Sequence, residues 1–159
     1  MKKMFLALAL VVSSLGALSA QADSKTIGLR MGGGFGYGAE VSYQQPIGIA
    51  NRVEVDLGLN HSGFGLSGIY QWVWDFSELA DGFNWYAGVG GGIGSYNFDY
   101  LTDKNKANVT TLGVLGQIGL EYQFEIPLTI SVDYRPGVYF ASGLNSSFDG
   151  ICLSARYRF

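Results

Sequence analysis

The last nine residues, 151–159, alternate strictly between apolar and polar side chains. Successive side chains of a β-strand point to opposite faces. One face of such a strand would carry Ile151, Leu153, Ala155, Tyr157 and Phe159, and the other Cys152, Ser154, Arg156 and Arg158. A half-buried strand of a soluble protein shows the same alternation, so the pattern predicts a strand with one apolar face and leaves open what that face meets.

The same period of two recurs in seven upstream segments, at 27–35, 39–44, 52–59, 64–74, 83–94, 112–124 and 128–140. Glycine-rich or polar stretches separate these segments, the longest being the loops 97–108 and 142–150. We therefore expect eight strands of about ten residues, the length that crosses a bilayer at a tilt. Pro136 cannot donate to a ladder, so we expect a β-bulge there.

The N-terminal segment has the pattern of a secretory signal peptide. Two lysines precede an apolar run at 4–12, and Ala20-Gln21-Ala22 gives a small-residue cleavage site. The apolar run is shorter than the roughly 20 residues that a membrane helix needs. We expect residues 1–22 to be removed and residues 23–159 to form one domain.

Composition narrows the class of protein. Hydrophobic residues make up 48% of the chain and charged residues 14%, and Cys152 is the only cysteine, so no disulfide can support a small exported fold. The 10 basic residues are outnumbered by 13 acidic ones, which gives no basis for nucleic-acid binding. An exported, aromatic chain that lacks helical periodicity is typical of a membrane β-barrel.

Up-and-down topology would gather the outward aromatic side chains at two levels, as the two membrane–water interfaces favour. The level of the short turns would hold Tyr43, Trp72, Trp74, Trp85, Tyr122, Tyr157 and Phe159, which we name the aromatic girdle, with Phe83 and Phe124 beside it. The opposite rim would hold Phe35, Phe64 and Phe140. A soluble barrel with this face inside is disfavoured, because eight strands enclose too little space for three tryptophans.

The opposite face carries charges of both signs in equal number. They are Arg30, Arg52, Arg135, Arg156 and Arg158 against Glu40, Glu54, Asp56, Glu121 and Asp133. Buried charges persist when they are paired, so we predict a lumenal ion-pair network that plugs the barrel. We expect Arg30 near Glu40, and Arg156 near Asp133 and Glu121. The glycine row of segment 83–94 would leave room for long side chains from across the lumen.

Catalytic and metal-binding patterns are weak. One histidine and one cysteine cannot form the usual metal clusters, and we expect no metal or cofactor. Gly63–Gly68 formally matches a dinucleotide fingerprint, but no helix follows it. His61, with Ser62 beside it, is the sharpest enzymatic candidate, for a lipid A-modifying activity. We favour a polar turn residue and expect no catalytic residues.

Several motifs together resemble small porin-like outer-membrane proteins of Bacteroidetes and, more loosely, the OmpX and OmpA barrel type. They include Asn51–Asp56, Tyr70-Gln71-Trp72, Asn84–Gly90, Gly119–Tyr122, Pro127–Gly137 and the closing Arg156–Phe159. The resemblance implies an all-β, eight-stranded antiparallel up-and-down transmembrane β-barrel in the outer membrane of a Gram-negative bacterium. It also implies insertion by the barrel-assembly machinery, which would read Leu153, Ala155, Tyr157 and Phe159.

Fold does not fix function, so three functions are weighed. We expect a non-enzymatic integral barrel, structural or surface-interacting, that is monomeric and surrounded by outer-membrane lipids and lipopolysaccharide. Its contact surface would be the loops 97–108 and 142–150. A narrow porin-like channel and a lipid A-modifying enzyme are the alternatives.

Overall fold

The computed structural model describes residues 24–32, 38–60, 63–77, 81–98, 107–140, 144–147 and 150–159, and these form an all-β fold. Within these ranges no helix is long and apolar enough to cross a membrane. The strands are β1 (Thr26–Gly32), β2 (Gly38–Pro46), β3 (Asn51–Asn60), β4 (Gly63–Asp75), β5 (Phe83–Phe98), β6 (Ala107–Gln123), β7 (Leu128–Tyr134), β8 (Gly137–Phe140), β9 (Leu144–Ser147) and β10 (Ile151–Arg158).

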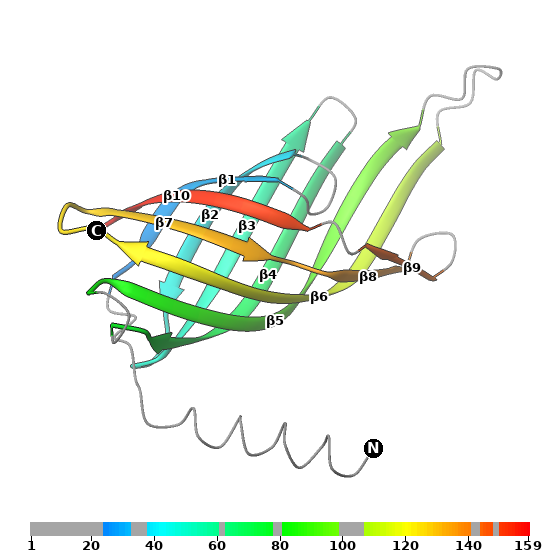
Figure 1. Ribbon diagram of the computed structural model, residues 1–159. Helices are drawn as coiled ribbons and strands as arrows, with labels where there is room; N and C mark the ends of the chain where they lie inside the picture. The colour runs from blue at the N-terminus through cyan, green and yellow to red at the C-terminus, as the bar shows by residue number, and fades with distance from the viewer. Residues whose placement is uncertain are drawn as a thin grey trace, which may run out of the picture.

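The strands close into a barrel (Figure 1). Strands β1 to β6 pair in chain order, β7 pairs with β6 and β10, and β10 returns to β1, all antiparallel. Strand β8 continues β7 along the same partner, β6. The wall therefore has eight strands with up-and-down connections, as the sequence predicts.

The interruption between β7 and β8 differs from the predicted bulge at Pro136. Tyr134 pairs with Ile118 and Gly137 with Leu115, so two residues face two residues and the register against β6 is unbroken. The Pro136 carbonyl accepts from the Gly116 amide at 2.9 Å, so proline keeps its acceptor role without its donor. Against the neighbouring strand on the other side, the register shifts by one residue. Tyr134 pairs with Ile151 of β10, whereas Gly137, three residues later, pairs with Ser147 of β9, four residues earlier. The extra residue lies on the strand opposite the proline.

Both predicted loops are shorter than the sequence suggested. Strands β5 and β6 stay paired as far as Phe98 and Ala107, which leaves only 99–106 of the 97–108 segment between them. Residues 144–147 of the other predicted loop form β9, which pairs with β8. The polar composition of these segments predicts loops, but the hydrogen bonds of a strand ladder need only backbone groups, so polar segments can pair as strands.

The sidedness of the wall decides its environment. Outward side chains such as Leu120 and Val132 are 45% and 46% exposed, while Arg156 and Glu121 on the inward face are each 1% exposed. A wall of exposed aliphatic residues around a closed ladder of hydrogen bonds is built to meet lipid, where no backbone group can be left unpaired. The chain is a transmembrane β-barrel.

Candidate functional site

The lumen of the barrel holds most of the charged side chains of the described strands. Their alternation with outward apolar residues turns them inward. Nine of the ten predicted network residues are at most 8% exposed: Arg30, Glu40, Arg52, Glu54, Asp56, Glu121, Asp133, Arg135 and Arg156. We call these nine residues the lumen cluster.

Arg30 connects three strands at one end of the lumen cluster. Its Nη1 donates to Glu40 Oε2 at 2.8 Å, which is the contact predicted between neighbours on β1 and β2. Its Nη2 donates to Asp133 Oδ1 on β7 at 2.7 Å. A planar guanidinium presents its donors as a fork, so one side chain can bind two carboxylates from different strands.

Glu54 is the centre of the lumen cluster. One carboxylate oxygen accepts from Arg135 Nη2 at 2.5 Å, and the other from Arg156 Nη2 at 2.8 Å. Gln44 and Gln117 donate to the same two oxygens at 2.6 and 3.2 Å. Four donors around one fully buried carboxylate compensate for the water it has lost.

Arg135 and Arg52 extend this network to opposite walls. Arg135 on the β7–β8 strand also binds Asp56 of β3 at 2.7 Å. Arg52 of β3 binds Glu121 of β6 through both Nη atoms, at 3.1 and 2.7 Å. The Arg52 guanidinium also lies 4.9 Å from the ring centre of Tyr86, and the Tyr86 hydroxyl donates to Asp133 at 3.3 Å. These contacts cross the lumen from side to side.

Arg156 was expected near Asp133 and Glu121, but the structure gives it a hydrogen bond to neither. Its guanidinium binds Glu54, Ser42 and Ser131, while Asp133 is taken by Arg30 and Glu121 by Arg52. The expectation assumes that residues at equal distances along the chain from the turns lie at equal depth, but neighbouring strands of a barrel are staggered, so equal distances do not give equal depth.

Arg158 does not belong to the lumen cluster. It lies at the turn end of β10, where Nη1 donates to Gln123 Oε1 at 2.9 Å and Nη2 to the carbonyls of Phe124 and Ile126. Arg158 thus ties the end of the closing strand to the β6–β7 turn. The correction leaves four guanidiniums and five carboxylates in the lumen cluster.

The excess negative charge coincides with the carboxylate nearest to solvent. The Glu40 side chain keeps 9% of its surface exposed, whereas those of Glu54, Asp56, Glu121 and Asp133 keep none. A carboxylate that retains contact with water loses less hydration than a fully buried one. Water at the Glu40 end can therefore compensate the unbalanced charge.

Uncharged inward residues complete the filling of the lumen, and the sequence reasoning did not assign them to the site. Gln71 joins Arg52 to Gln117, and Tyr86, Ile69, Val73 and Leu115 are at most 1% exposed. The predicted space along β5 is used by near neighbours, because a Cβ on Gly88 would lie 2.8 Å from Ile69. The sequence did carry a signal for these uncharged residues, because each alternates with outward residues and so falls on the inward face of its strand.

The aromatic girdle lies on the outer wall near the turn end. Trp74 stacks on Trp85 with ring centres 4.2 Å apart, and Tyr157 and Phe159 stack at 6.5 Å. Tyr122 contacts Phe83 and Phe124 at 4.9 and 4.6 Å. The remaining members, Tyr43 and Trp72, lie on β2 and β4 and are partly or largely exposed.

At the opposite rim Phe64 and Phe140 are exposed, while Phe35 lies outside the described residues. The outer face of β10 carries Leu153, Ala155 and Tyr157, all exposed, with exposed Phe159 directly after it.

The enzymatic candidates His61 and Ser62 lie outside the described residues, as do 1–23, 99–106, 141–143 and 148–149. In the part of the chain that the structure covers, no group of three histidine, cysteine or carboxylate side chains could hold a metal ion.

Comparisons with known proteins give a likeness to solved structures alone. No family model matches the chain, and no curated protein does. Among solved structures, the chain is similar to the outer membrane protein Ail of Yersinia pestis in a phospholipid bilayer nanodisc. The TM-score is 0.44 and the identity 15%, over 86% of this chain and 97% of that one. Identity at this level carries no function from one protein to the other.

Proposed function

We propose that the protein is a non-enzymatic outer-membrane β-barrel of a Gram-negative bacterium, closed to solutes by the lumen cluster. The observation that carries the proposal is the pairing of Arg135 with Glu54 and Asp56, which joins opposite walls through the middle of the lumen. All three side chains are at most 2% exposed, which supports a lumen that is filled by side chains at this level. A structural or surface-contact role then falls to the wall and to the loops in 97–108 and 142–150.

The outer wall supports the membrane assignment. Exposed leucine, isoleucine and valine side chains cover it on every wall strand, and the aromatic girdle marks one interface. We propose outer-membrane phospholipid and lipopolysaccharide as its surroundings. Delivery would use the N-terminal signal peptide and the barrel-assembly machinery, with the exposed row on β10 as the recognised strand.

Conductance in planar lipid bilayers tests the plug. We expect the wild-type protein to insert and to give no conductance steps, because the ion pairs occupy the lumen. Arg135→Ala combined with Glu54→Ala removes the central pair and should produce small steps if the protein still inserts. Steps from the wild-type protein would reject the plug and favour the narrow channel.

The enzymatic alternative has its own test. Mass spectrometry of lipid A from cells with and without the protein should give the same acyl pattern. A changed pattern that disappears with His61→Ala would replace this proposal by a lipid A-modifying activity.

A further inference from the structure

The outer wall carries a groove that crosses strands β5, β6, β7 and β10 and is lined mainly by apolar side chains. The volume of this open groove is about 640 Å³, and that of another hollow beside β1 and β10 is about 380 Å³. Ligand sites typically enclose about 300–1,000 Å³, so the larger groove is in the range of a binding site.

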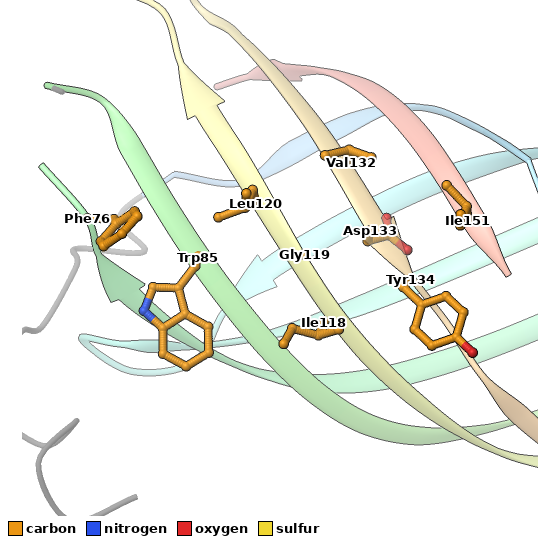
Figure 2. Close-up of a pocket in the computed structure, with 9 residues that line it drawn as sticks. All are labelled: Phe76, Trp85, Ile118, Gly119, Leu120, Val132, Asp133, Tyr134 and Ile151. Atoms are coloured by element: carbon orange, nitrogen blue, oxygen red, sulfur yellow. The ribbon is translucent and has the colours of Figure 1, made fainter. Parts of the chain in front are cut away.

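The groove is built by two rows of side chains with backbone between them (Figure 2). Trp85, Leu120 and Val132 are register partners on β5, β6 and β7 and form one row. Ile118, Tyr134 and Ile151 are partners on β6, β7 and β10 and form the other. Gly119 and Asp133 turn their Cα–Cβ direction inward, so their backbone forms the floor. The resulting trough has apolar walls and runs across strands.

The direction of the groove follows from the stagger of the strands. Counted from the turn end, Trp85 is the third residue of β5, Leu120 the fourth of β6, Val132 the fifth of β7 and Ile151 the eighth of β10. Within each row the count rises by one residue per strand, from Trp85 to Val132 in one and from Ile118 to Ile151 in the other. The groove therefore slants from the aromatic girdle toward mid-wall, by two residues or about 7 Å of strand in each row. Phe76, held by its amide to the Phe83 carbonyl at 2.9 Å, stands at the girdle end.

We propose that this groove binds one acyl chain of a phospholipid whose headgroup lies at the level of the aromatic girdle. The groove opens to the lipid side of a transmembrane wall, its walls are apolar, and it begins at an interface and ends in the hydrocarbon region. The proposal rests on the membrane placement given above. It goes beyond general lipid contact because it assigns one retained chain to one place on the wall.

Native mass spectrometry of the protein, delipidated in detergent and then supplied with dimyristoyl phosphatidylethanolamine, tests the groove. Wild-type protein should retain one lipid. Val132→Trp fills the groove and should reduce the retained fraction about tenfold, since a filled site leaves no room for the chain. Val55→Trp is the matched control, because Val55 is an outward valine of β3, 39% exposed against 46% for Val132.

Three outcomes would overturn the proposal: no retained lipid on the wild-type protein, equal retention in both variants, or retention that vanishes with phosphatidylglycerol. The last would mean that a headgroup, and not the chain, is recognised. Flotation of the same proteins with phospholipid vesicles separates this failure from failure of the membrane placement. Proteins that float but retain no lipid reject the groove alone, whereas proteins that stay unbound reject the placement.

Discussion

Inward residues of the lumen are so closely packed that adding a single side-chain atom is expected to disturb their packing. Gly119 illustrates it, because a Cβ there would lie 2.5 Å from Tyr86 Cζ and 2.8 Å from Asp133 Cβ. The Tyr86 ring cannot move aside easily, since it is fully buried, bonded to Asp133 and covered by Arg52. The Tyr86 ring therefore fits in the lumen only because residue 119 is a glycine without a side chain.

We predict that Gly119→Ala destabilises the barrel by about 1–3 kcal/mol, the usual cost of overpacking a core. Urea unfolding in lipid vesicles, followed by tryptophan fluorescence, measures the free energy of unfolding. Gly68→Ala is the control, because a Cβ at Gly68 meets nothing within 4 Å. That variant should be neutral or slightly stabilising, as alanine costs less chain entropy than glycine. Equal losses at both positions would contradict the packing account.

Glu54 gives the corresponding prediction for charge. Glu54→Gln removes the carboxylate charge shared by Arg135 and Arg156 and should lower the free energy of unfolding by about 3–5 kcal/mol, because the buried Arg156 loses its carboxylate partner while Arg135 keeps only Asp56 close by. The same substitution at Glu125, exposed in the β6–β7 turn, should change it by less than about 0.5 kcal/mol. If the two variants unfold at the same urea concentration, Glu54 does not centre the network.

At the scale of the elements, the closing strand β10 is fastened at its last residues. The Arg158 amide donates to the Pro127 carbonyl at 3.0 Å, and the Phe159 amide to the Lys25 carbonyl at 3.0 Å. The Arg158 side chain adds its bonds to the carbonyls of Phe124 and Ile126. These contacts join both neighbours of β10 where the ring closes.

We predict that Arg158→Ala slows closure of the barrel and costs about 1.5–3 kcal/mol, the range for hydrogen bonds made by a charged group. The fraction of heat-modifiable, folded protein on unboiled gels follows closure with time. Arg158→Lys should rescue only part of the loss, because an ammonium lacks the planar fork. Full rescue by lysine would indicate that charge alone, and not the two-carbonyl contact, is needed.

The whole molecule depends on which face meets lipid. Leu57 is outward on β3 and 41% exposed, while Ile126 is 60% exposed in a turn. We predict that Leu57→Arg costs about 2–4 kcal/mol in lipid vesicles, against about 0–1 kcal/mol for Ile126→Arg, since a charge is expensive only within the hydrocarbon region. A soluble barrel would accept arginine at both exposed positions, so equal unfolding free energies would reject the transmembrane wall.

The sequence by itself determined the eight strands, their antiparallel order and, for the side chains that the structure describes, the face of the wall on which they lie. These follow from local parity and from turns between neighbours, and one shift in register would invert every face. Parity placed Arg156 and Glu121 inside and Leu120 and Val132 outside, as the structure has them.

Only the tertiary structure decided which inward groups meet. Arg156 binds Glu54 across the lumen, Arg158 leaves the lumen cluster for a turn, and the groove from Trp85 to Ile151 follows the stagger of four strands. Stagger is a property of the closed ring, which sums the registers of all neighbouring pairs. No single segment contains that sum, so contacts across the lumen could not be counted from the turns.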